Sequence, residues 1–165
     1  MIEVIPSHLQ LRHVETALFF KSLLGHSRPH ITDCYNPKHP EIITDVAHNE
    51  ESFLVLCGFI NKQNINGKKV LMIGLQQNKD LGTATSCIIK TFDQIIITQT
   101  GERNFLPAEK LDKLLNYENS RIILNPLKAA KFIRNLDKED CGVIAGSHYF
   151  GPTISNEFKI SFDNI

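Results

Sequence analysis

From residue 41 onward the chain alternates short apolar runs with segments of helical pattern, and this alternation constrains the fold more than any other feature. The runs are rich in Ile, Val and Leu, as is typical of strands that are covered on both faces of a sheet. They lie at residues 41–44, 69–73, 94–98, 121–124 and 142–145. We therefore expect five strands joined by crossover connections.

The segments between these runs carry helix start signals. Asn49 is suited to cap a first helix that runs to residue 60, and either Asp80 or Thr83 could cap a second. Pro107 and Pro126 suit the first turns of a third and a fourth helix. Five strands with four intervening helices predict an α/β fold, namely a doubly wound, mostly parallel sheet with helices on both faces.

The two ends of the chain carry weaker patterns. Residues 8–24 place apolar side chains at helical spacing and end at Gly25, so we expect a helix there. Residues 30–34 and 153–165 are candidates for extra edge strands, which gives a sheet of about five to six strands. We divide the chain into residues 1–25, an N-terminal helix or linker, and residues 26–165, the α/β domain.

The composition excludes several classes of partner. Acidic and basic residues balance at 18 each, and no basic run is interleaved with aromatic residues, so we expect no nucleic-acid partner. The apolar runs are strand-sized and no secretory leader is visible, so we expect neither a membrane span nor export. The four cysteines form no Cys-x-x-Cys pair, which favours reduced thiols in a cytoplasmic protein.

The segment Asp-Val-Ala-His-Asn at 45–49 is the strongest site candidate, because it lies where the first strand ends and a helix begins. Ligands bind at the carboxyl ends of strands in open α/β sheets. Asp45 could bind a ribose hydroxyl, a metal ion or an amine, or it could simply satisfy turn amides. His48 could reach the same cleft or be an ordinary surface histidine. Asn49 could line the cleft as well as cap the helix.

Two further segments should reach the same edge. Gly-Ser-His-Tyr-Phe at 146–150 follows the last strand, where Ser147 could approach a carboxylate or form a turn above an aromatic anchor. Lys79 and Asp80 follow the second strand and could join the cleft or start a solvated helix. The histidines at 26, 30 and 39 lack the spacing of a zinc site, so we expect no metal site. No phosphate-binding loop and no Gly-x-Gly-x-x-Gly motif occur.

Three of these motifs together resemble a known family. Residues 45–49 resemble the Asp-Gly/Val-Ala-His-Asn signature of folylpolyglutamate synthases and dihydrofolate synthases, members of the Mur ligase superfamily. Gly-Leu at 74–75 followed by Lys-Asp at 79–80 is similar to the glycine and Lys-Asp after that family's second strand, and residues 146–150 are similar to its Gly-Ser-Leu-Tyr-Phe. The resemblance covers roughly residues 28–152 and implies the Rossmann-like C-terminal domain of such an enzyme.

The resemblance implies roles for individual residues. The family phosphorylates a folate carboxylate with ATP, and the amino group of glutamate then attacks the acyl phosphate. By resemblance, Asp45 would contact ATP, and His48 and Ser147 would help to hold glutamate. The family also uses an arginine of a Trp-Pro-Gly-Arg segment on ATP, for which Arg28 in Gly-His-Ser-Arg is the nearest equivalent here.

The elements that would bind the triphosphate, Mg²⁺ and the folate belong to the family's N-terminal domain, and the sequence shows none of them. We therefore expect a monomeric, detached C-terminal domain that is inactive alone and works with an N-terminal ATPase domain in cis or in trans. A truncated expression product, a split-gene product and a degenerate remnant all remain open. So do two other functions: a non-catalytic binding module on this fold, and the C-terminal domain of a cell-wall Mur ligase.

Overall fold

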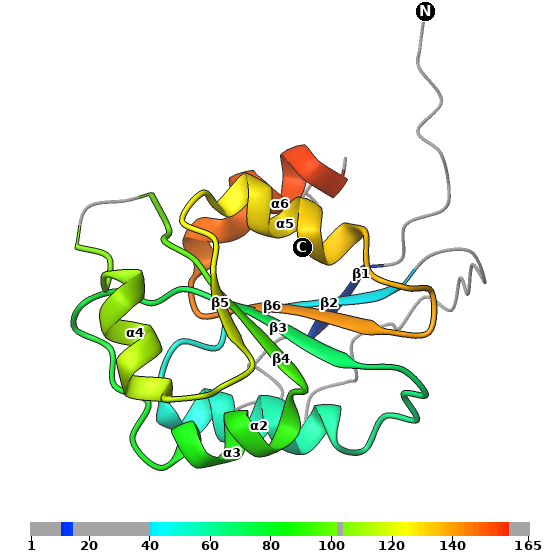
Figure 1. The fold of residues 1–165 in the computed structure, drawn as a ribbon, viewed down its shortest axis with the longest axis horizontal. Helices are drawn as coiled ribbons and strands as arrows, with labels where there is room; N and C mark the ends of the chain where they lie inside the picture. The colour runs from blue at the N-terminus through cyan, green and yellow to red at the C-terminus, as the bar shows by residue number, and fades with distance from the viewer. Residues whose placement is uncertain (1–10, 15–39, 102–103, 159–165) are drawn as a thin grey trace, which may run out of the picture.

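A computed structural model describes residues 11–14, 40–101 and 104–158, and these residues form a sheet with helices on both faces (Figure 1). The strands are β1 (Leu11–Val14), β2 (Glu41–Asp45), β3 (Lys69–Ile73), β4 (Gln94–Ile97), β5 (Ser120–Ile122) and β6 (Cys141–Ala145). The helices are α2 (Glu50–Ile60), α3 (Ala84–Thr91), α4 (Ala108–Leu115), α5 (Pro126–Arg134) and α6 (Gly151–Phe158), with a short 3₁₀ turn, η1 (His148–Phe150).

The order of the strands across the sheet is β1-β2-β6-β3-β4-β5, and all the strand pairings among the described residues are parallel. This confirms the predicted Rossmann-like, doubly wound α/β fold, and each of the five predicted strands is present with its ends moved by two residues or fewer. Strand β6 is last in the sequence but lies between β2 and β3, so the chain reverses its direction of travel across the sheet after β5.

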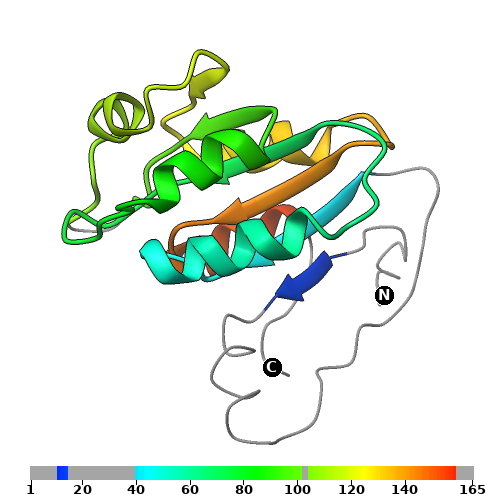
Figure 2. The ribbon, with the colours of Figure 1, turned by 90° about the horizontal axis from the view of Figure 1, so that it is seen from below.

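The two faces of the sheet pack against different helices because alternate strand residues point to opposite sides. Ile43 and Leu71 pack with α2, α3 and α4, whereas Ile42 and Met72 pack with α5 and α6. All four side chains are buried, and burying each contributes about 1.5–3 kcal/mol. In Figure 1 α5 and α6 lie above the sheet and α2 and α3 below it, and Figure 2, seen from below, shows α2 and α3 side by side in front of the strands.

The first predicted helix begins and ends where expected because its cap and its apolar positions agree. The Asn49 side chain accepts a hydrogen bond from the Ser52 N–H, and the Ser52 hydroxyl group accepts one from the Asn49 N–H. This reciprocal capping box satisfies two amides that a helix start otherwise leaves unpaired. Phe53 and Leu56 then face the core.

Two local predictions at the ends of the chain are wrong. The helix expected over residues 8–24 is a strand at Leu11–Val14, where β1 extends the open edge of the sheet beside β2; the rest of that segment lies outside the described residues. The edge strand expected over residues 153–165 is helix α6 through Phe158, because Arg134 binds Glu157 at 2.9 Å and the α6 side chains pack under α5. The possible strand at 30–34 lies outside the described residues.

Neither residue expected to cap α3 does so. Thr83 occupies the cap position, but its side chain makes no capping bond and instead binds Glu50. Asp80 accepts a hydrogen bond from the Gly82 N–H at 3.0 Å and thereby stabilises the preceding turn.

Candidate functional site at the carboxyl edge of the sheet

The topology creates a switch point where β6 lies between β2 and β3. The connections that leave β2 and β3 lead to α2 and α3 on one face, whereas the connection that leaves β6 leads to α6 on the other face. Adjacent strands whose connections diverge in this way leave room for a ligand at their carboxyl ends. The candidate segments at 45–49, 74–80 and 146–150 follow these three strands.

Gly146 holds the three loops together. Its N–H donates to the Ala47 carbonyl group at 2.6 Å, which joins the loop after β6 to the loop after β2. Its φ of +109° lies in a region that favours glycine. A Cβ at this position would overlap the carbonyl oxygen of Gly74 and lie 3.0 Å from its nitrogen, so the backbone of the loop after β3 is also in direct contact.

Asp45 ends β2 and is 7% exposed. Its Oδ1 accepts a hydrogen bond from the Ala47 N–H at 2.6 Å, so one carboxylate oxygen fixes the turn that leads to α2. This is the turn-forming role weighed as the alternative to ligand binding. Because an ionised carboxylate only accepts hydrogen bonds, Asp45 suits a ligand group that donates a proton, such as a hydroxyl or an ammonium, or a metal ion, and not an ionised phosphate.

His48 is half-buried at the start of α2. Its Nδ1 lies 2.7 Å from the Val46 carbonyl oxygen, and since a carbonyl can only accept, Nδ1 carries the proton. The other ring nitrogen, Nε2, therefore accepts a hydrogen bond in the neutral ring and donates one in the imidazolium form. A neutral His48 thus suits an ammonium group, and a protonated one suits a carboxylate.

Ser147 follows Gly146 and is 5% exposed. Its Oγ accepts a hydrogen bond from the Tyr149 N–H at 3.2 Å, and Phe150 is buried below, so the predicted turn with an aromatic anchor is present. That bond uses the oxygen as an acceptor and leaves the hydroxyl proton available to donate to an anion. The rings of His148 and Tyr149, both exposed, lie 4.1 Å apart at the outer end of this loop.

Lys79 and Asp80 lie in the connection between β3 and α3, and this connection is tied to α2 by a residue that the sequence reasoning missed. Glu50, the first residue of α2, accepts hydrogen bonds from the N–H and the hydroxyl group of Thr83. These bonds lower the pKa of Glu50, with the hydroxyl making the larger contribution. The partners are 33 residues apart, so no local sequence signal connects them.

The structure therefore gathers Asp45, His48 and Ser147 on loops that meet at one edge of the sheet, with Lys79 and Asp80 on the neighbouring loop. Asn49 lies at the same edge, but its side-chain oxygen is occupied by the capping box. Arg28 lies outside the described residues. Nucleoside hydroxyls and the charged ends of an amino acid can hydrogen-bond to this combination of a carboxylate, an imidazole and a hydroxyl group. Within the described ranges, no three His, Cys, Asp or Glu side chains come together to hold a metal ion.

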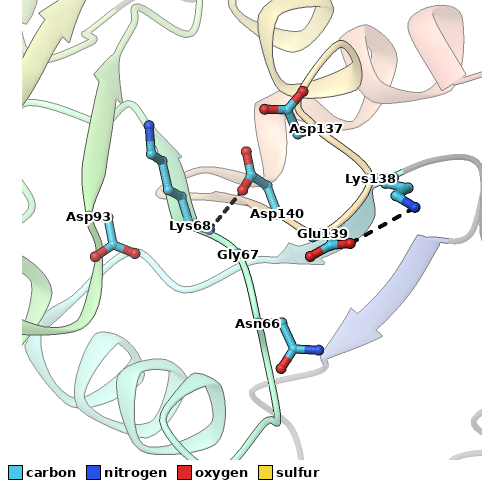
Figure 3. A pocket seen from close by; sticks show the side chains of 8 residues that line it. All are labelled: Asn66, Gly67, Lys68, Asp93, Asp137, Lys138, Glu139 and Asp140. Atoms are coloured by element: carbon cyan, nitrogen blue, oxygen red, sulfur yellow. Dashed lines mark hydrogen bonds and ion pairs between the residues drawn. The ribbon is translucent and has the colours of Figure 1, made fainter.

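A separate groove of about 670 Å³ lies at the opposite, amino edge of the sheet (Figure 3). It is lined by Asn66, Gly67, Lys68, Asp93, Asp137, Lys138, Glu139 and Asp140. Two of its four acidic side chains make structural hydrogen bonds: Asp140 accepts from the Lys68 N–H at 2.7 Å and Asp93 from the Lys69 N–H at 2.8 Å, which anchors the entry to β3. No residue predicted for the site lies there.

None of the helices in the described ranges combines the length and apolar character needed to traverse a bilayer.

The strand order and the diverging connections at β6 define a Rossmann-like α/β domain. Solved structures of folylpolyglutamate synthases share this fold. No protein-family model matches the chain, and no curated protein matches it significantly.

Three of these structures illustrate the likeness. *E. coli* FolC in complex with DHPP and ADP superimposes with a TM-score of 0.61 at 22% identity, over 72% of this chain and 28% of that one. A bifunctional folylpolyglutamate synthase/dihydrofolate synthase with Mn, AMPPNP and L-glutamate bound gives 0.65 at 20% identity, over 73% and 29%. The *Mycobacterium tuberculosis* folylpolyglutamate synthase complexed with ADP and AMPPCP gives 0.62 at 19% identity, over 73% and 30%. The chain thus spans less than a third of the length of these proteins.

Proposed function

We propose that this chain is the C-terminal domain of an ATP-dependent folylpolyglutamate or dihydrofolate synthase, which joins glutamate to a folate or pteroate carboxylate through an acyl phosphate. The observation that carries the proposal is the Gly146 N–H to Ala47 carbonyl bond, because it brings the loops of Asp45, His48 and Ser147 to one edge. The fold likeness to enzymes whose structures contain nucleotide and glutamate supports it.

In this proposal each side chain has a role that matches its hydrogen-bonding capacity. Asp45, with Arg28, contacts ATP, and its acceptor-only carboxylate suits a ribose hydroxyl. His48 and Ser147 hold glutamate, with the Ser147 hydroxyl donating to a carboxylate. Orienting the amine in this way would contribute to catalysis by positioning. Asn49, Lys79 and Asp80 line the same cleft.

The proposed activity requires a second protein domain. The triphosphate, the Mg²⁺ ligands and the folate site would be supplied by an N-terminal ATPase domain, in cis or in trans, with residues 1–25 leading into the domain formed by residues 26–165. When bound, ATP would supply the phosphoryl group that activates the carboxylate, and Mg²⁺ would neutralise the charge on its phosphates. The chain alone is inactive because it cannot cradle the triphosphate.

The test is an ADP-release assay with ATP, folate and glutamate, run on the chain alone and then with a folylpolyglutamate synthase ATPase domain added. We expect no turnover alone and turnover with the added domain. Ser147→Ala should then raise the KM for glutamate by about 10- to 100-fold, the effect of losing a hydrogen bond to a charged group. Ser86→Ala, on exposed α3 surface, is the matched control. ADP release by the chain alone would refute the requirement for a second protein domain.

A non-catalytic binding module is the second candidate, because Asp45 and Ser147 both make hydrogen bonds within their own loops. Calorimetric titration with nucleotide and with glutamate separates the two. Absence of binding to either ligand, with the ATPase domain present, would favour a non-catalytic interaction module on the same fold. Turnover with a cell-wall precursor in place of folate would instead assign the domain to that branch of the Mur ligases.

A further inference from the structure

We propose that Glu50 is a positioning residue: it fastens the β3–α3 connection onto the amino end of α2, so that Lys79 and Asp80 stand at the same edge as His48 and Ser147. This rests on the proposed function for its ligand. The contact itself is a feature of this chain that can be tested separately.

The first observation is a pair of hydrogen bonds to one carboxylate oxygen. Glu50 Oε1 accepts from the Thr83 N–H at 2.8 Å and from the Thr83 hydroxyl group. Hydrogen bonds to an ionised acceptor are stronger than those between neutral groups. The two residues are 33 positions apart, so the contact holds the β3–α3 connection against α2 and does not merely close a local turn.

The second observation is the space that the carboxylate occupies. Gly82, with a φ of +45°, lies directly against Glu50: a Cβ at Gly82 would lie 2.5 Å from the Glu50 Cδ. The backbone of the loop therefore approaches the carboxylate closely at two successive residues, Gly82 and Thr83.

Backbone hydrogen bonds just after β3 hold the other end of the β3–α3 connection. The Glu50 contact is therefore a second anchor. The Leu75 carbonyl group accepts from the Leu106 N–H at 2.8 Å, and the Gln77 N–H donates to the Asn104 carbonyl group at 2.7 Å. Lys79 and Asp80 lie between that anchor and the Glu50–Thr83 contact. The capping box fixes the start of α2. The Glu50–Thr83 contact therefore holds the loop at a set position relative to α2.

Amide hydrogen exchange of the chain tests the contact. Glu50→Ala should accelerate exchange at the Thr83 amide about tenfold or more, and Glu50→Gln, which keeps an acceptor oxygen, should restore most of the protection. Glu51→Ala is the matched control, because Glu51 is an exposed acid in the same helical turn. Gly82→Ala should reproduce the effect of Glu50→Ala from the loop side. Unchanged Thr83 exchange in Glu50→Ala would overturn the proposal.

Steady-state kinetics with the ATPase domain added tests the positioning role. Glu50→Ala should raise the KM for glutamate or ATP about tenfold with little change in kcat, and Glu50→Gln should recover most of it, since the domain stays folded and only the loop is released. Unchanged KM values in Glu50→Ala would overturn the positioning role. If the wild-type assembly shows no turnover, the proposed function fails and the positioning role fails with it, whereas the Thr83 exchange result still decides whether the contact exists.

Discussion

Replacing Gly146 by alanine tests how the three loops are joined. The new side chain would have to adopt a φ of +109°, which costs about 1–3 kcal/mol for a residue with a Cβ. It would also overlap the backbone of Gly74, and relieving an overpacked contact of this kind costs about 1–3 kcal/mol more. The expected loss is therefore about 2–6 kcal/mol. That is a large part of the total stability, which is of order 10 kcal/mol for a chain of 165 residues.

Two other glycines separate these contributions. Gly101 has a φ of +77° but would find nothing within 4 Å of an added Cβ, so Gly101→Ala reports backbone strain alone. Gly151 has neither a positive φ nor a close neighbour, so Gly151→Ala should be neutral or slightly stabilising at its place in α6.

Urea unfolding followed by far-UV circular dichroism suits a chain with no tryptophan. With an m-value of about 1–3 kcal/mol per M, Gly146→Ala should lower the midpoint by at least about 0.7 M. Gly101→Ala should lower it by clearly less. Equal losses in these two variants would refute the close contact between the ends of β3 and β6, and with it the convergence of the loops.

Three further outcomes follow from local contacts. Asn49→Ala should cost about 1 kcal/mol in the same urea assay because it removes the capping box, and an unchanged midpoint would contradict the cap. Burial, the largest cause, raises the pKa of Cys57 from 9.0 to about 12; alkylation at pH 8 should therefore modify half-buried Cys87 first, and rapid labelling of Cys57 would contradict its burial. Because the pKa of Glu50 is lowered from 4.5, its contact should persist above pH 4.5 and be lost as pH falls through the lower folded value; an NMR titration of the Thr83 amide with a midpoint at or above 4.5 would contradict this.

The layers of the fold could be predicted because local signals and tertiary structure agree through the middle of the chain. Buried strands such as β3 consist of consecutive apolar residues, and helix α2 has both a cap at Asn49 and apolar side chains at helical spacing. The prediction failed at the ends, where tertiary contacts decide. Leu11–Val14 carries apolar residues at a spacing that also suits a helix, but it pairs with the open edge of β2.

At the C-terminal end the prediction failed in the opposite way, because a segment predicted as a strand is a helix. Weak alternation after residue 153 favoured a strand, yet Ile154 and Phe158 are four residues apart and both pack against the sheet. The Arg134–Glu157 ion pair adds a contact between α5 and α6 that no local pattern reveals. Non-local partners, and not intrinsic propensity, fix this segment.

The candidate site was predictable where it depended on strand ends. The loops after β2, β3 and β6 could be located because parallel strands present their carboxyl ends at one edge. What could not be read from the sequence was the local bonding: the Asp45 bond to the Ala47 N–H, the proton position on His48 and the contact from Glu50 to Thr83. These depend on backbone positions set by the whole sheet.

The central claim is that the carboxyl edge, and not the groove at the amino edge, receives the ligands. The direct measurement is an NMR titration of the ¹⁵N-labelled chain with L-glutamate and with Mg-ATP. The largest amide shift changes should fall at residues 45–49 and 146–149. Shift changes centred on residues 66–68 and 137–140 would place the ligands at the opposite edge and contradict it.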